Sequence, residues 1–257
     1  VLRRRRRLAQ PNPLTLSTDL LQVGSMVMAR GGDLDEAESL SREALALQEP
    51  GTGVVTRNRV WALTSLSEVL LARGDLAGAE ELLDQSLEER RRTYGDLHPL
   101  VAESLGELGS FYAQVGRLDE AEAATRQALK VTLETAGPQH TRYAGSLTWL
   151  AGVLSRKAKF EEADSLTTQA LEIRAQAQGT GTAVYAETLA ILAEIRTARG
   201  MYESADSLLG LALEALPDHV EGASVPRRIH SALADLYEKT GRHEESARHR
   251  ALAAAGL

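Results

Sequence analysis

The sequence predicts an all-α solenoid in which one helix–turn–helix unit is written six times. Three observations predict it: a phrase of the form Gly-x-Leu-x-x-Ala recurs at nearly constant spacing, small residues recur at fixed positions around it, and apolar residues precede it at i, i+3 and i+7. Self-similarity with a period of about 20–50 residues is typical of repeat proteins, in which each unit buries its apolar face against its neighbours.

The recurring phrase marks the turn between the two helices of each unit. Its copies begin at Gly32, Gly74, Gly116, Ala158, Gly200 and Gly241, so the steps are 42, 42, 42, 42 and 41 residues. A glycine is expected there because a residue without a Cβ adopts a left-handed backbone at a helix end without strain. Ala158 is the one exception. Acidic residues such as Asp35 and Glu36 then begin the second helix, near the positive end of its dipole.

Two columns of small residues flank the turn. Twelve residues before the last residue of the phrase are Ser25, Ser67, Gly109, Ala151, Ala193 and Ala234, and seven residues after it are Ala44, Ser86, Ala128, Ala170, Ala212 and Ala253. Helix axes approach one another closely only where side chains are small. We therefore expect these columns at the contacts between helices.

The apolar spacing gives the limits of the helices. Leu63, Leu66 and Leu70, for example, lie on one face of a helix. We predict first helices near 18–31, 60–73, 101–115, 143–157, 184–199 and 227–240, and second helices near 34–48, 76–92, 118–136, 160–177, 203–215 and 243–255. The predicted domain organisation is a basic, disordered tail over 1–16 and a single array over 17–257, whose polar last unit is typical of a terminal cap.

These columns resemble the tetratricopeptide repeat, over roughly Thr18 to Ala255. The 42-residue period and the linker Tyr94-Gly95-Asp96-Leu97-His98-Pro99 are similar to those of kinesin light chains and of arrays in many bacterial regulatory proteins. HEAT-type repeats of comparable length lack the fixed glycine and the small-residue columns. The resemblance implies a right-handed superhelix of about twelve antiparallel helices, with the first helix of each unit on the concave side.

The positions that face inward in this family imply a groove. Its predicted lining is Trp61, Glu68, Glu103, Glu107, Trp149, Arg156, Glu187, Ile191 and Glu194, extended by Val23, Met26 and Arg30 at one end and by Asp235 and Lys239 at the other. Both tryptophans of the chain fall on this wall, either as anchors for a bound peptide or as packing between adjacent first helices. The excess of glutamate predicts a partner segment with an apolar anchor and basic flanks.

One column of this wall differs from that of kinesin light chains. Where those proteins hold the peptide backbone with asparagines, this chain has Ser65, Glu107, Trp149 and Ile191. The difference argues against the same cargo motif.

Composition and spacing argue against catalysis and against several partners. The chain has no cysteine, which excludes disulfides and zinc–thiolate sites, and a net charge of -7, which disfavours a nucleic-acid surface. His98 and His140 occupy equivalent linker positions about 10–20 Å apart, too far for one metal ion. We read them as loop histidines that precede helices. We therefore expect no enzyme activity, no metal and no cofactor.

The basic N-terminus leaves three interpretations open. The run Arg3–Arg7 is read as a solvated tail, as an anchor to anionic lipid beside an upstream membrane segment, or as a nucleic-acid contact. The chain itself has no apolar stretch near the length of about 20 residues that crosses a bilayer. We expect a cytoplasmic protein, with membrane contact only through such an upstream segment.

The sequence predicts a non-catalytic, monomeric scaffold that binds a peptide or partner protein in its groove. An alternative is the C-terminal regulatory region of a larger membrane-anchored bacterial serine/threonine kinase or a similar signalling protein, which the first residue, Val rather than Met, also allows. Self-association through the ends of the solenoid is a third hypothesis.

Overall fold

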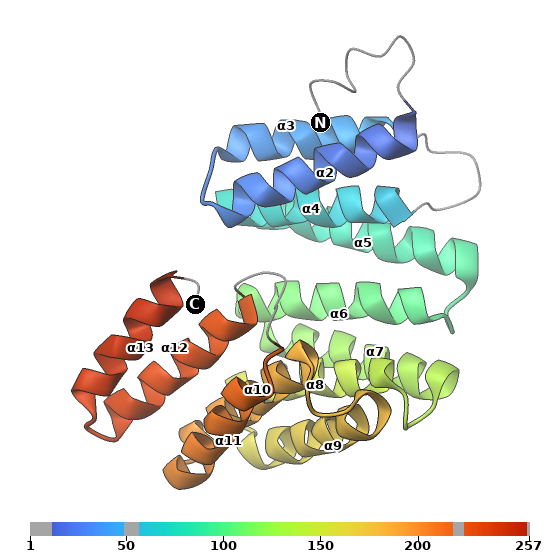
Figure 1. The fold of residues 1–257 in the computed structure, drawn as a ribbon. Coiled ribbons are helices and arrows are strands. Elements are labelled where there is room, and N and C mark those ends of the chain that lie inside the picture. Colours follow the sequence, from blue (N-terminus) through green and yellow to red (C-terminus); the bar gives the residue numbers. More distant parts are fainter. Residues whose placement is uncertain (1–11, 49–56, 218–223, 256–257) are drawn as a thin grey trace. The chain divides into compact units, whose positions relative to one another are not determined.

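The computed structural model describes residues 12–48, 57–217 and 224–255. These residues form twelve α-helices and no strand (Figure 1). The first helices of the units are α2 (Pro13–Ala29), α4 (Arg57–Arg73), α6 (Pro99–Gln114), α8 (Thr141–Arg156), α10 (Ala183–Ala198) and α12 (Ser224–Lys239). The second helices are α3 (Leu34–Ala46), α5 (Leu76–Tyr94), α7 (Leu118–Ala136), α9 (Phe160–Gln178), α11 (Tyr202–Glu214) and α13 (His243–Ala255). The predicted all-α solenoid of six helix–turn–helix units is confirmed.

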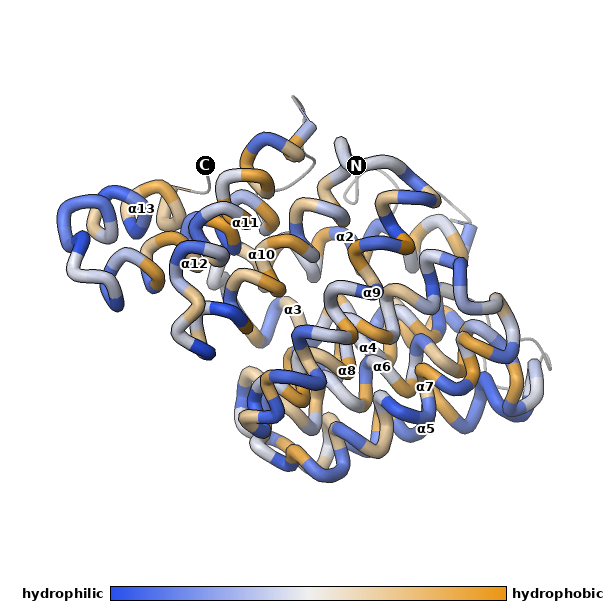
Figure 2. The backbone as a smooth tube through the Cα atoms, turned by 90° about the horizontal axis from the view of Figure 1, so that it is seen from below, coloured by the Kyte–Doolittle hydropathy of each residue, from blue (hydrophilic) through white to orange (hydrophobic). Residues whose placement is uncertain are grey.

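The helices fall into two compact units, Val1–Arg117 and Leu118–Leu257. The single array over 17–257 stays a prediction. In the first unit, a core cluster forms around Leu20, Leu21 and Leu40, while the second unit contains separate clusters along α8 to α12. Figure 2 shows hydrophobic and hydrophilic stretches alternating along the helices, as expected when one face of a helix is buried.

The first helices begin one to five residues earlier than predicted, and a capping side chain precedes four of them, α2, α6, α8 and α10. The side chain of Asn12 accepts hydrogen bonds from the backbone N–H groups of Leu14 and Thr15, and Pro13 occupies the first turn of α2. This Asn-Pro signal places the start of α2 at Pro13 rather than at 18. Residues 13–16 thus belong to a helix and not to the predicted tail, and Arg3–Arg7 lie outside the described residues.

The two linker histidines are also helix caps. Nδ1 of His98 accepts a hydrogen bond from the N–H of Leu100 (3.2 Å), and Nδ1 of His140 accepts one from the N–H of Arg142 (3.0 Å). The prediction that they precede helix N-termini is confirmed.

The predicted left-handed turn residues are found in five of the six units. Backbone φ is +83° at Gly74, +84° at Gly116 and +77° at Gly200. In the first helix–turn–helix repeat, α2 and α3, the left-handed residue is Gly31 and not Gly32, since α2 already ends at Ala29. Ala158, with φ of +56°, is the one non-glycine residue with positive φ in the described part of the chain. The unit that lacks the glycine therefore keeps the turn and strains a side-chain-bearing residue.

Replacing Ala158 with Gly is expected to stabilise the protein by about 0.5–1 kcal/mol. A left-handed conformation costs a residue with a Cβ about 1–2 kcal/mol, and part of this gain is lost because glycine gives the unfolded chain more freedom. Urea denaturation followed by circular dichroism measures the change. Gly200→Ala, at the equivalent turn, is the reverse control and should destabilise the protein. A loss of stability in Ala158→Gly would contradict the left-handed turn at this residue.

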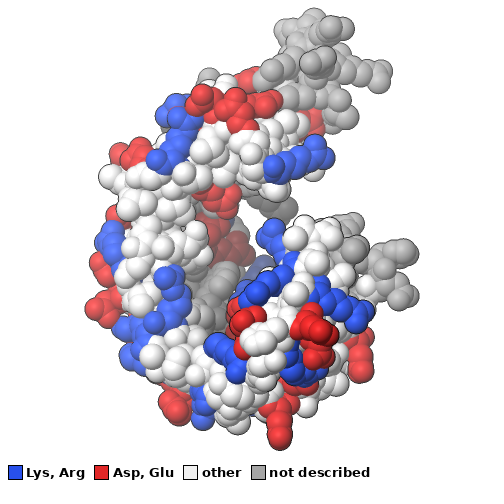
Figure 3. All heavy atoms as spheres, turned by 90° about the vertical axis from the view of Figure 1, so that its left-hand side faces the viewer, with Lys and Arg blue, Asp and Glu red and all other residues white. Residues whose placement is uncertain are grey.

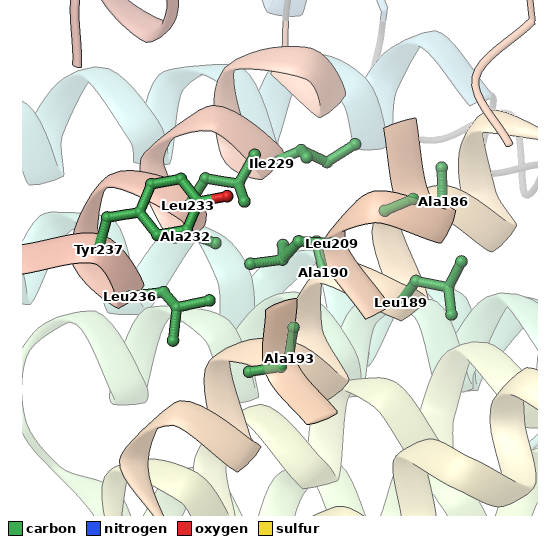
Figure 4. Packing of buried hydrophobic residues seen from close by; sticks show 12 residues of the cluster. Ala186, Leu189, Ala190, Ala193, Leu209, Ile229, Ala232, Leu233, Leu236 and Tyr237 are labelled. Atoms are coloured by element: carbon green, nitrogen blue, oxygen red, sulfur yellow. The ribbon is translucent and has the colours of Figure 1, made fainter. Parts of the chain in front are cut away.

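Small residues occupy the contacts between helices, as predicted. The last residues of the recurring phrase are fully buried, namely Ala37, Ala79, Ala121, Ala163, Ala205 and Ser246. Around α10, α11 and α12, Leu209 packs in one buried cluster with Ala190, Ala193 and Leu233 (Figure 4). In the first unit the buried small residue of α2 is Gly24, while Ser25 is exposed, a shift of one position from the prediction.

In the first five repeats, an acidic residue of the second helix directly follows the buried alanine of the recurring phrase, and successive copies are 42 residues apart. The column consists of Glu38, Glu80, Glu122, Asp164 and Asp206. Each forms an ion pair with a cation that follows it in the next first helix or turn, at 2.6–3.5 Å: Arg73, Arg117, Lys157, Arg199 and Arg242. Figure 3 shows basic and acidic side chains next to one another on the surface. The acidic partner is largely buried in three of these pairs, namely Glu38, Glu122 and Asp164, and each pair joins a second helix to the first helix or turn that follows it.

Candidate functional site

The predicted groove residues of the first compact unit lie on α4 and α6. Trp61, Thr64 and Glu68 are spaced by three and four residues and so share one face of α4. Glu103 and Glu107 share a face of α6 in the same way. The hydroxyl of Thr64 donates a hydrogen bond to Oε2 of Glu107 (3.3 Å), which joins the two faces. Four predicted residues are thereby brought to one surface.

Three of these residues form an acidic cluster, defined as Glu68, Glu103 and Glu107. Desolvation raises the pKa of Glu107, and the charges of Glu103 and Glu68 raise it further, against the opposing effects of Arg90 and Thr64. Desolvation also raises the pKa of Glu68. No Lys or Arg among the described residues forms an ion pair with Glu68. The cluster thus holds more negative charge than its surroundings neutralise.

A buried arginine lies behind this cluster. Arg90, only 7% exposed, donates from Nη1 to the carbonyl oxygen of Leu100 (2.6 Å) and to Oγ of Ser104 (3.0 Å). The same Nη1 lies 3.8 Å from Oε2 of Glu103, and the buried Nε of Arg90 has no hydrogen-bond partner among the described residues. Arg90 therefore positions α6 and compensates the cluster only in part.

The second compact unit repeats this arginine two repeats later. Arg174 donates to the carbonyl oxygen of Val184 (3.3 Å) and to the hydroxyl of Thr188, and desolvation lowers its pKa. The spacing of 84 residues is a signal in the sequence that the predicted groove lining did not use. Both arginines join a second helix to the first helix of the next repeat.

The predicted acidic wall is neutralised in the second unit. Arg228 of α12, which the predicted lining omits, pairs with Glu194 through two hydrogen bonds of 2.8 and 2.9 Å and lies 3.9 Å from Glu187. This bidentate contact raises the pKa of Arg228, against desolvation. The acidic character expected along the whole groove is therefore concentrated in the Glu68–Glu103–Glu107 cluster.

Ile191 lies in the core and not on an open wall. It is 9% exposed and packs in one cluster with Leu150 and Leu154, because α10 is covered by the helices on both sides of it in the chain. An isoleucine with so little exposed surface cannot serve as a partner contact without rearrangement. The resemblance to the family predicted that Ile191 lines the groove, but packing between α8 and α10 buries its side chain.

The two tryptophans occupy different environments. Trp61 is half-buried and packs against the core cluster of the first unit, which supports its interpretation as a packing residue. Trp149 is 41% exposed on α8, beside the core rather than within it. Of the remaining predicted residues, Met26, Arg30, Arg156, Asp235 and Lys239 are exposed, and Val23 is half-buried.

Replacing Glu107 with Gln is expected to raise the melting temperature at pH 7 by about 1–3 °C, since a domain of this size shifts by about 2–4 °C per kcal/mol. Folding raises the pKa of Glu107, so the ionised carboxylate destabilises the folded state above that pKa. The amide removes this penalty and still accepts from Thr64. The gain should vanish near pH 4, where wild-type Glu107 is protonated. Calorimetry at both pH values measures it, with Glu172→Gln at an exposed site of α9 as the control. An equal gain in both variants would contradict the repulsion within the cluster.

Two further features bear on the site. Within residues 12–48, 57–217 and 224–255, no group of three or more His, Cys, Asp or Glu side chains could hold a metal ion. None of the described helices is both long enough and apolar enough to cross a bilayer.

Comparison with known proteins identifies the repeat. Residues 58–134, which span α4 to α7, match the model of the tetratricopeptide repeat family. No curated protein sequence matches the chain.

Several solved structures share the fold. BtubC (BKLC) from P. vanneervenii has a TM-score of 0.64 and 20% identity, over 93% of this chain and 90% of its own. A kinesin light chain-like protein of Podosopora anserina with nearly identical TPR-like repeats has a TM-score of 0.61 and 22% identity, over 79% of this chain and 95% of its own. The apo form of RapI has a TM-score of 0.66 and 13% identity, over 95% of this chain and 84% of its own.

These matches agree with the repeat columns, the turn residues and the helix order described above. Residues 58–134 therefore match the tetratricopeptide repeat, and the described residues share the fold of the kinesin light chain-like arrays.

Proposed function

We propose that the protein is a non-catalytic scaffold that binds a basic segment of a partner protein on the α4–α6 surface of its first compact unit. The observation that carries this proposal is the acidic cluster of Glu68, Glu103 and Glu107. Two of its three carboxyl groups have raised pKa values, although the chain has cations elsewhere that neutralise equivalent acids.

The energetics favour a ligand of opposite charge. Like charges held together in a partly desolvated surface cost stability, and such perturbed groups gather at binding sites more often than elsewhere. A Lys or Arg side chain placed among the three carboxylates would lower the raised pKa values of Glu68 and Glu107 and relieve the repulsion. The pairing of Glu194 with Arg228 within the chain supports this preference for a basic side chain.

A peptide library displayed on phage, without any assumed partner, tests the charge preference. We expect peptides enriched in Lys or Arg to bind the wild type, with affinity that falls steeply as salt rises. The triple variant Glu68→Gln, Glu103→Gln, Glu107→Gln should lose at least about tenfold in affinity for them, or about 1.4 kcal/mol.

The matched control changes the net charge equally at a different surface. Glu81→Gln, Glu134→Gln and Glu172→Gln replace three exposed glutamates of second helices. This control should bind the basic peptides nearly as well as the wild type. Equal losses in both triple variants would reduce the effect to net charge, and enrichment of neutral or acidic peptides would refute the proposal.

We further propose Trp149 as an apolar anchor for a partner of the second compact unit. Its exposed indole offers a large contact area at low cost in entropy, which is where interface energy concentrates. Trp149→Ala should weaken binding by about tenfold or more while the melting temperature changes little. If the variant instead melts well below the wild type and binding per folded molecule is unchanged, Trp149 is a packing residue.

A further inference from the structure

The hairpin of α12 and α13 is held together mainly by polar contacts. Among the residues of α13, only Ser246 and Ala253 are buried, and the helix packs chiefly against α12. So small a buried apolar area stabilises the contact between α12 and α13 only weakly, because hydrophobic stabilisation scales with the area buried. The stability of this hairpin therefore depends on its hydrogen bonds.

Two groups of hydrogen bonds join the helices. Oγ of Ser246 lies 2.9 Å from the carbonyl oxygen of Ala234 and 3.1 Å from Oε2 of Glu238, and these two acceptors share its one hydroxyl hydrogen. Arg250 also contacts Glu238, at 3.1 Å. Toward the other end of the hairpin, Nδ1 of His230 lies 2.9 Å from Nδ1 of His249. The rings stack with centroids 5.0 Å apart, and the ring of Tyr237 lies 5.5 Å from that of His249.

A contact between two ring nitrogens of histidine has a strict proton requirement. One Nδ1 must carry a hydrogen and donate it, and the other must offer its lone pair. The first added proton can bind Nε2 of the donor ring and leave this bond intact. The second must take the lone pair of the accepting Nδ1, which breaks the bond and places two cations side by side.

We propose that the His230–His249 pair makes the α12–α13 hairpin sensitive to acid: the hairpin is closed while the pair shares its hydrogen bond and opens when both rings are protonated. This device is independent of the proposed binding surface on α4 and α6. It would release α13 at mildly acidic pH and leave the other hairpins of the chain folded.

The charged surroundings support the proposal. On α13, Arg248 faces His249 together with Glu245, and Arg242 lies in the preceding turn. From α12 and α11, Tyr237 contacts His249 and donates its hydroxyl hydrogen to Asp206, which Arg242 also approaches. The acids of α10 that lie nearest to α12, Glu187 and Glu194, are engaged by Arg228.

These surroundings disfavour charged imidazole. Desolvation and the charge of His249 lower the pKa of His230, while desolvation, Arg248 and Arg242 lower the pKa of His249 against the opposite effect of Glu245. Because the folded pKa values lie below the usual 6.5, the stability that the pair contributes is complete above pH 6.5 and is lost as pH falls through the lower folded values.

The carboxylates of the hairpin respond in a separate range. The pKa values of Glu238 and Glu245 are lowered from 4.5, so their contributions persist until the pH falls below that value. A transition between about pH 6.5 and 5 therefore reports histidines, and the double variant below separates the His230–His249 pair from His243, whose Nδ1 lies 3.2 Å from Oε1 of Glu238.

Hydrogen exchange measured by mass spectrometry tests the proposal on the full chain. Between pH 7.5 and 5.5, protection factors of α13 amides should fall by about tenfold, while those of α9 stay constant. In the double variant His230→Asn, His249→Gln, the amides can keep a hydrogen bond that does not titrate, so the fall should disappear. His140→Asn, which replaces one capping residue with another, is the control and should keep the fall.

The tautomers can be read directly by ¹⁵N NMR of the histidine rings, which decides the matter even if the double variant fails to fold. We expect a coupled titration of His230 and His249, with the apparent pKa values of the pair below 6.5 and one Nδ1 protonated before titration begins. Independent titration of the two rings near 6.5, or unchanged protection of α13 at pH 5.5, would overturn the proposal.

Discussion

Leu150→Ala is expected to lower the free energy of unfolding by about 2–5 kcal/mol, the range for removing a buried leucine side chain. Leu150 is fully buried in a cluster to which α8, α9 and α10 all contribute. A cavity there removes contacts from several helices at once, and the close packing of interiors leaves few atoms free to fill it. Urea denaturation followed by circular dichroism measures the loss.

The control for this variant is an exposed leucine of the same compact unit. Leu133 of α7 is 42% exposed, so Leu133→Ala should cost much less than Leu150→Ala. Similar losses in both variants would contradict the assignment of Leu150 to the core of the second unit.

Ala163→Leu is the second large effect: it also lowers the free energy of unfolding, but by adding side-chain volume to the core instead of removing it. Ala163 of α9 belongs to the same cluster as Leu150 and is fully buried where helices approach closely. A leucine there forces the helices apart or strains side-chain rotamers, which costs about 1–3 kcal/mol. Ala123→Leu, at an exposed position of α7, should be nearly neutral.

The double variant Leu150→Ala, Ala163→Leu asks whether the two positions share one space. If they do, the added volume fills part of the cavity, and the double variant loses less than the sum of the single losses. Strict additivity would mean that the two side chains do not compete for the same volume, and would count against the small-residue column as the contact between helices.

The helix boundaries show how far sequence patterns reach. All twelve predicted helices are present, and α7 and α13 have the predicted limits of 118–136 and 243–255. The misses are local: α2 begins at Pro13 because of an Asn-Pro cap, and its buried small residue is Gly24 rather than Ser25. The first repeat departs from the others in sequence, so the columns align it less well.

The candidate site was predicted less completely than the fold. Family positions identified Glu68, Glu103 and Glu107, but could not show that this cluster lacks the neutralising cation that Glu194 has. That difference depends on Arg228, which comes from the next first helix and contacts Glu194 only in the folded chain. In the same way, the repeat columns gave no indication that His230 and His249, 19 positions apart, share a hydrogen bond.

The sequence by itself determined the period, the turns and the contact columns, because each of these depends on one local requirement that every repeat must meet: a left-handed residue, a small residue or an apolar stripe. The tertiary structure alone decided which charges remain uncompensated, which tryptophan is exposed and which histidines meet. These outcomes depend on side chains from different helices, and their free energies are set by burial and by the distances between charges, which no single column of residues contains.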